Sequence, residues 1–315
     1  MLISSLPPVH QAGLLKAIIE NPTVEAVRYN TGMSSAYSPY ETIKRIKALA
    51  DPAKKPVYID LKGRQLRVIE WANLPEGPIL LNHRIQVELP ADVYFRGDDR
   101  CALREVVRGN EIYVDPLPKA PVGRGQSVNI ISKNLTVEGG LLDLDHEYIK
   151  AGLNQGITNF MLSFVESKEN VEELEEAIAR HSYGSKSIDD CKVVFKIESQ
   201  AGVEFVGRLE RKNFVDESPY RLMAARDDLR IEIGLLNVME ALKLITDRDP
   251  EAICASRLLL GLERGDVSLA DLSDIEYMRL IGYKHFMLSD EISREHSEKA
   301  FAFWQEYCLA RPFTA

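Results

Sequence analysis

The chain has 315 residues, 45% hydrophobic and 28% charged, a balance typical of a folded protein with a large core. Its net charge of −9 argues against a nucleic-acid partner, because phosphate backbones are bound through clustered Lys and Arg, and favours a small-molecule ligand. No apolar run reaches the roughly 18 residues of a membrane span, so we expect neither a membrane partner nor insertion.

The cysteines indicate neither a zinc site nor a disulfide framework. Cys101, Cys191, Cys254 and Cys308 are widely separated and form no CxxC pair. The N-terminus also lacks a basic segment followed by a long apolar one. We therefore expect a cytoplasmic protein.

Short apolar or β-branched segments alternate with amphipathic ones, the pattern of parallel strands joined by helices. Strands are predicted at 2–7, 26–31, 56–63, 157–165, 192–199, 220–226, 252–259 and 284–289, each followed by a helix. Eight such units match an α/β protein with a (β/α)8 TIM barrel, which needs about 250 residues. The barrel is expected to comprise 1–67 and 141–315.

The stretch 68–140 breaks this rhythm. Short β-like pieces alternate there with Gly, Pro and Asn turns, which indicates an inserted small β-domain. It follows the third strand, so it would rise from the carboxyl-terminal rim of the barrel and act as a lid over the site.

Ionisable residues gather at the carboxyl ends of the predicted strands, where the chemistry of such barrels is built. Lys196 and Glu198 are two residues apart, so they lie on one face of their strand. Glu198 and Asp228 together would form a two-carboxylate site for Mg²⁺ or Mn²⁺. Arg28, Arg67 and Lys196 would add positive charge for phosphoryl oxygens.

Several segments, in order, resemble the pyruvate kinase family: VRYNTGM, IDLKGRQLR, KIESQAGVEF, LMAARDDLRIEIG and HFMLSDEIS. The resemblance implies a pyruvate-kinase-type barrel with a lid domain, and we expect the family's C-terminal domain to be missing. It implies catalytic roles for Lys196 and Arg28, and Glu198 and Asp228 as metal ligands. It also implies substrate contacts for Asp227, Ser256 and Arg226, nucleotide contacts for Asn30 and Arg67, and a monovalent-cation site at Asn30 and Asp60.

The departures concentrate at the substrate end. NTGM replaces the family's N-x-S-H-G, and Leu61 replaces a threonine that would ligate a monovalent cation, so we expect potassium independence. Asp227, Arg230 and Asp290 replace glycines. Asp227 would repel an anionic substrate unless Arg226, Arg230 or Arg257 neutralises it.

Structural roles are the alternatives for several of these residues. Arg28 and Arg67 could form ion pairs with Asp60 or other acids, and Ser256 could serve packing. Acidic residues near predicted helix starts are expected to cap helices, namely Asp145, Asp271 and Asp274.

Three functions stay open. The first is a Mg²⁺-dependent phosphotransferase acting on phosphoenolpyruvate or a related small phosphorylated acid, with ADP or ATP as a partner. The second is a metal-dependent lyase or aldolase on a pyruvate-like acid, and the third is a non-catalytic binding protein. In each case the family resemblance implies at least a homodimer, formed through barrel helices.

Overall fold

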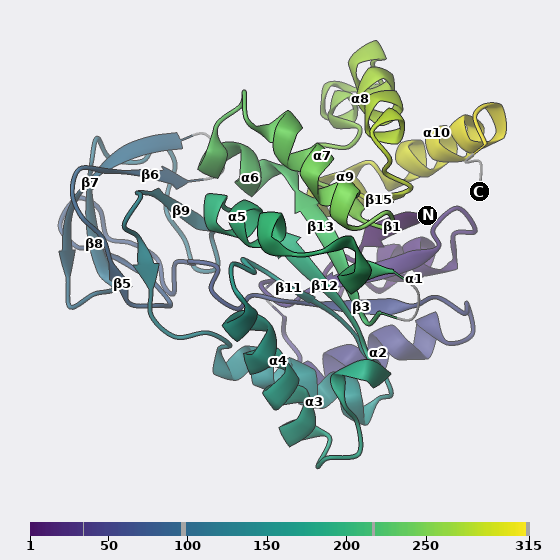
Figure 1. Ribbon diagram of the computed structural model, residues 1–315, viewed down its shortest axis with the longest axis horizontal. Helices are drawn as coiled ribbons and strands as arrows, with labels where there is room; N and C mark the ends of the chain where they lie inside the picture. Colours follow the sequence, from purple (N-terminus) through teal and green to yellow (C-terminus); the bar gives the residue numbers. More distant parts are fainter. Residues whose placement is uncertain (34, 96–98, 216–217, 313–315) are drawn as a thin grey trace.

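The computed structural model describes residues 1–33, 35–95, 99–215 and 218–312 (Figure 1). Its centre is a closed barrel of parallel strands in the order β1-β15-β14-β13-β12-β11-β3-β2. The strands are β1 (Leu2–Ser5), β2 (Ala26–Asn30), β3 (Val57–Leu61), β11 (Asn159–Leu162), β12 (Lys192–Ile197), β13 (Tyr220–Ala225), β14 (Ile253–Ala255) and β15 (His285–Met287). Each lies inside a segment predicted to be a strand, so the predicted barrel is confirmed.

Helices surround the barrel and bury its outer face. They are α1 (Ala12–Glu20), α2 (Pro39–Ala50), α3 (Asp143–Asn154), α4 (Lys168–His181), α5 (Gln200–Arg208), α6 (Arg226–Ile233), α7 (Val238–Arg248), α8 (Leu269–Leu280), α9 (Asp290–Glu295) and α10 (Ser297–Ala310). Short 3-10 turns occur at η1 (Ile188–Asp190), η2 (Arg211–Phe214) and η3 (Leu260–Arg264). Within the described ranges, no helix has both the length and the apolar character needed to cross a membrane.

Alternation along the strands separates two cores. In β12, Val193, Phe195 and Ile197 belong to the core beneath the helices, whereas Val194 belongs to a smaller core inside the barrel. That inner core includes Ile3, Ala26, Tyr58, Met161 and Val194. Two residues further along the same strands, the buried inward positions are polar, namely Ser5, Arg28, Asp60, Ser163 and Lys196. The apolar filling therefore ends below the mouth, and a polar layer lies above it.

The chain between β3 and α3 forms a separate β structure, which projects to the left of the barrel in Figure 1. One antiparallel sheet has the order β4-β8-β7-β6-β9, and β5 pairs with β10. The strands are β4 (Ile79–Leu80), β5 (Ile85–Gln86), β6 (Ala91–Phe95), β7 (Asp99–Val107), β8 (Glu111–Asp115), β9 (Val128–Ile131) and β10 (Thr136–Val137). A core of its own, which includes Leu66, Val93 and Ile130, holds this insertion together.

Asp145 joins the two ends of the insertion. It lies in the first turn of α3, is 1% exposed, and accepts hydrogen bonds from the backbone nitrogens of Lys62 (2.8 Å) and Gly63 (3.0 Å), just after β3. It also accepts one from the nitrogen of Leu142 at 3.1 Å, which confirms the predicted capping role. One carboxylate thus fastens the point where the chain leaves the barrel to the point where it returns.

Replacing Asp145 with alanine should lower the free energy of unfolding by about 2–4 kcal/mol, because buried backbone donors would lose their acceptor. Urea denaturation followed by circular dichroism measures this loss. Asp143→Ala is the matched control, because Asp143 lies exposed in the same helical turn. Equal losses in the two variants would contradict the role assigned to Asp145.

Candidate active site

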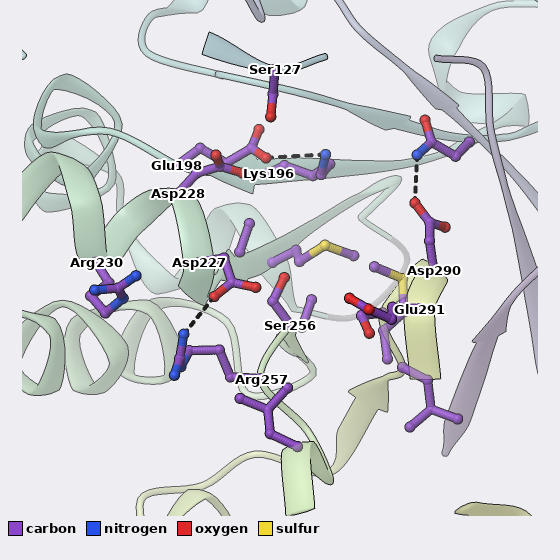
Figure 2. Close-up of a pocket in the computed structure, with 18 of the residues that line it drawn as sticks. Ser127, Lys196, Glu198, Asp227, Asp228, Arg230, Ser256, Arg257, Asp290 and Glu291 are labelled. Atoms are coloured by element: carbon purple, nitrogen blue, oxygen red, sulfur yellow. Dashed lines mark hydrogen bonds and ion pairs between the residues drawn. The ribbon is translucent and has the colours of Figure 1, made fainter. Parts of the chain in front are cut away.

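A cavity of about 1050 Å³ opens at the carboxyl ends of the barrel strands, where the insertion meets the barrel (Figure 2). Barrel residues and residues of the insertion, such as Ser127 and Asn129, line it together. Of the residues predicted to form the site, those that line the cavity are Arg28, Asn30, Arg67, Lys196, Glu198, Asp227, Asp228 and Ser256. They come from segments far apart in the sequence, as expected for a barrel mouth.

Asp60 is the centre of a layer of charged side chains beneath this cavity. This charged layer consists of Asp60, Arg28, Lys62 and Lys196. Its carboxylate is fully buried and accepts a hydrogen bond from Nε of Arg28 at 2.7 Å. Nζ of Lys62 and Nζ of Lys196 each lie 3.4 Å from one of its oxygens. Burial acts to raise the pKa of Asp60, but the charges of Arg28, Lys196 and Lys62 outweigh it and hold the pKa well below its usual range. The carboxylate is ionised, and the ion pair considered for Arg28 is present.

Lys196 is held between acceptors at the end of β12. Its Nζ donates to Oγ of Ser163 at 2.8 Å and lies 3.1 Å from Oε1 of Glu198, the contact drawn in Figure 2. Burial acts to lower the pKa of Lys196, but Asp60 and Glu198 outweigh it and raise the pKa above its ordinary value. Lys196 therefore carries its positive charge into the cavity.

Glu198 and Asp228 bring two carboxylates to the same side of the cavity. Oε2 of Glu198 accepts from the nitrogen of Phe164 at 2.8 Å, and Oδ1 of Asp228 accepts from Nδ2 of Asn129 at 3.1 Å. Burial raises the pKa of both carboxyls; Lys196 opposes this, while the charge of Asp228 raises the pKa of Glu198 further. The pair is short of positive charge.

Such a pair fits a hard divalent cation. Carboxylate oxygens are the ligands that Mg²⁺ and Mn²⁺ prefer, and an added cation would relieve the repulsion between the carboxylates. Among the described residues, no three Asp, Glu, His or Cys side chains gather as a metal cluster. Glu198 and Asp228 could hold the ion and leave other coordination positions to a substrate and water.

Asp227 and Ser256 lie at the lower side of the cavity in Figure 2. Oδ1 of Asp227 pairs with Nη1 of Arg257 at 2.9 Å, the neutralisation that would relieve repulsion of an anionic substrate. Ser256 and Arg257 both adopt the left-handed backbone region, with φ of 63° and 57°. This turn directs Arg257 back toward the first turn of α6.

Arg226 was expected to contact the substrate, but its side chain does not line the cavity. Its guanidinium is buried, donates to the carbonyl of Ser256 at 2.7 Å and pairs with Asp274 at 2.7 Å. Arg226 therefore holds the turn that carries Ser256 and Arg257, and does not reach a ligand in the cavity. The same pair shows that Asp274, expected to cap α8, instead binds Arg226; Asp271 does accept from the nitrogen of Ser268 at the start of that helix.

Arg67 and Asn30 line the cavity, but their polar groups already have partners. Arg67 donates to Oε1 of Gln65 at 2.8 Å and to the carbonyl of Gly125. A β-carbon at Gly32 would lie 2.7 Å from Cζ of Arg67, so the glycine of NTGM makes room for this guanidinium. Asn30 accepts from the nitrogen of Gly32 at 3.0 Å and donates to Asp290 at 2.7 Å.

Comparison with known proteins identifies the family. A family model described as "Pyruvate kinase, barrel domain" matches residues 92–296. The chain belongs to the pyruvate kinase family. The pyruvate kinases of Thermotoga maritima, Thermoplasma acidophilum and Methanocaldococcus jannaschii are 29%, 25% and 25% identical to it over 85%, 88% and 92% of its length. The chain spans 61%, 51% and 64% of those pyruvate kinases.

Sequence reasoning overlooked two residues of the site. Ser163 follows the inner-core residue Met161 by two positions, so the alternation of β11 could have indicated it. Asn129 lies on β9 of the insertion, and no sequence signal connects it to Asp228 on α6. Ser163 accepts a hydrogen bond from Lys196, and Asn129 donates one to Asp228.

Potassium ions should neither bind specifically to this protein nor raise its melting temperature. Asp60 is already surrounded by three cationic side chains, both polar groups of Asn30 are engaged, and Leu61 offers no side-chain oxygen. Melting temperatures in KCl and in choline chloride of equal ionic strength should agree, with NaCl as a further control. A saturable rise specific to K⁺ would show that a monovalent-cation site exists.

Proposed function

We propose that this protein is a Mg²⁺- or Mn²⁺-dependent phosphotransferase that acts on phosphoenolpyruvate or a related small phosphorylated acid. The observation that carries the proposal is the charged Nζ of Lys196, 3.1 Å from Glu198 and on the same cavity as Asp228. A fixed cation beside two carboxylates supplies the electrostatics that phosphoryl transfer requires. The names of the relatives support the same substrate class.

In this proposal, Lys196 stabilises charge on the transferring phosphoryl oxygens. The bond between phosphorus and the enol oxygen breaks, a bond to the acceptor oxygen forms, and the enolate takes a proton to give the 2-oxo acid. Glu198 and Asp228 would hold the divalent ion, which when bound would neutralise negative charge on the substrate oxygens. The backbone of Asp227, in the first turn of α6, and the side chain of Ser256 would orient the acid.

Arg28, Asn30 and Arg67 complete the proposed site. Arg28 would support catalysis through its field on Lys196 and Asp60, and Asn30 and Arg67 would face a nucleotide such as ADP or ATP. The homodimer stays a prediction that light scattering can test.

A metal-dependent lyase or aldolase, which performs enolate chemistry without a nucleotide, is the second candidate function. The observation that favours it is that Arg28 and Asn30 already bind Asp290.

Two measurements test the proposal. Titration with Mn²⁺, followed by electron paramagnetic resonance, should show a site that Glu198→Gln and Asp228→Asn each weaken at least about tenfold. Glu263→Gln is the control, because Glu263 is an exposed residue of the cavity rim. Phosphorus NMR should then show phosphoenolpyruvate consumed with ADP. Equal Mn²⁺ affinity in all variants would refute the metal site, and enolisation of pyruvate without nucleotide would favour the second candidate.

Replacing Lys196 with methionine should lower kcat by at least about a hundredfold, because the fixed positive charge at the transferring group is lost. The melting temperature should change little, since Asp60 keeps Arg28 and Lys62 as partners. A turnover assay and a melting curve on the same preparation separate the two effects. Retained turnover would show that phosphoryl transfer does not depend on Lys196.

The Asp227–Arg257 pair should govern the affinity for phosphoenolpyruvate. Arg257→Ala should weaken binding in the presence of Mn²⁺ by about three- to tenfold, because it leaves the Asp227 charge unbalanced beside an anion in a partly exposed position. In the Asp227→Gly background the same substitution should have little effect. Calorimetry on the four proteins of this cycle gives the coupling, and purely additive effects would mean that the pair is irrelevant to binding.

A further inference from the structure

Asp290 places a carboxylate of the protein itself at the mouth of the barrel. It is the first residue of α9, and its side chain is 34% exposed toward the cavity. Its Oδ1 lies 2.6 Å from Nη1 of Arg28, and its Oδ2 accepts from Nδ2 of Asn30 at 2.7 Å. Both oxygens are thus bound by the two β2 side chains that face the cavity, and Figure 2 shows Asp290 across the cavity from Asp227 and Arg257.

The position of Asp290 is fixed by the packing of α9 onto β1. Oγ of Ser289 accepts from the nitrogen of Ile292 at 3.2 Å and caps the helix. Oγ of Ser293 accepts from the nitrogen of Ser5 at 3.2 Å and also contacts Ser4. Because the helix is anchored on both sides of Asp290, the carboxylate is held against Arg28 by the fold.

Each nitrogen of the Arg28 guanidinium binds an internal group. Nε and Nη2 bind Asp60, and Nη1 binds Asp290 and Oγ of Ser5. Two carboxylates, those of Asp60 and Asp290, therefore contact this guanidinium, whose side chain is only 8% exposed. An incoming anion would have to displace Asp290 from Arg28 and Asn30, or approach its negative charge.

We propose that Asp290 is a specificity-determining residue that occupies, with its own carboxylate, the anion position formed by Arg28 and Asn30. The cavity then binds one anionic group on the side of Lys196 and Arg257 and disfavours a second on the side of β2. The part of the co-substrate that faces Asp290 is uncharged or cationic, such as a hydroxyl or an amine. This refines the proposed function, on which it rests for the identity of the cavity as the substrate site.

Binding of inorganic phosphate, measured by calorimetry at low ionic strength without metal, tests the inference separately from catalysis. Asp290→Asn keeps the shape of the side chain and removes its charge, while Asp290→Gly also opens the space. Each should bind phosphate about ten- to a hundredfold more tightly than the parent. The melting temperature of each variant should then rise with phosphate more than that of the parent, which also verifies that the variants are folded.

Glu291→Gln is the matched control, because Glu291 adjoins Asp290, lines the same cavity and loses the same charge. It should change phosphate affinity less than about threefold, since it acts only through the general field. Equal phosphate affinity in the parent and both Asp290 variants would overturn the inference, as would an equal gain in Glu291→Gln. Failure of Mn²⁺ to bind at Glu198 and Asp228 would count instead against the proposed phosphotransferase.

Discussion

The buried carboxylate of Asp60 is the interaction on which the site depends. Arg28, Lys62 and Lys196 come from β2, from the segment after β3 and from β12, and all converge on it. Three buried cations without a counter-charge would strongly lower the free energy of unfolding, because burying unpaired charges is strongly destabilising. Asp60 therefore allows a positively charged layer to exist inside a barrel mouth, and it aligns Lys196 with Glu198 and the cavity.

The site is assembled from two structural units. The barrel supplies the charged layer, and β9 of the insertion supplies Asn129, whose amide orients the Asp228 carboxylate at 3.1 Å. Asp145 holds the ends of that insertion together at the rim. Because orientation of a metal-ligating carboxylate depends on its hydrogen-bond partners, the insertion contributes to the candidate metal site.

Two of the departures from the family pattern introduce a charge that pairs with an arginine. Asp227 and Asp290 both stand where the family resemblance places glycine, and each pairs with an arginine, Arg257 and Arg28 respectively. The carboxylates proposed to bind metal and Lys196 are kept, whereas the anion position proposed at Arg28 and Asn30 is occupied by the carboxylate of Asp290. The chemistry proposed at Lys196 and the ligand choice proposed at β2 use different walls of one cavity, so each could change without the other.

The sequence by itself determined the barrel, because strand alternation and helical periodicity are local properties, and all eight strands lie where the pattern predicted them. The spacing of Lys196 and Glu198 also predicted that both side chains lie on one face of their strand. Only the tertiary structure decided that Arg226 turns away toward Asp274, that Asn129 reaches Asp228, and that Asp290 binds Arg28 and Asn30. Those contacts join residues from 48 to 262 positions apart, and a linear pattern does not encode which distant charge will neutralise which.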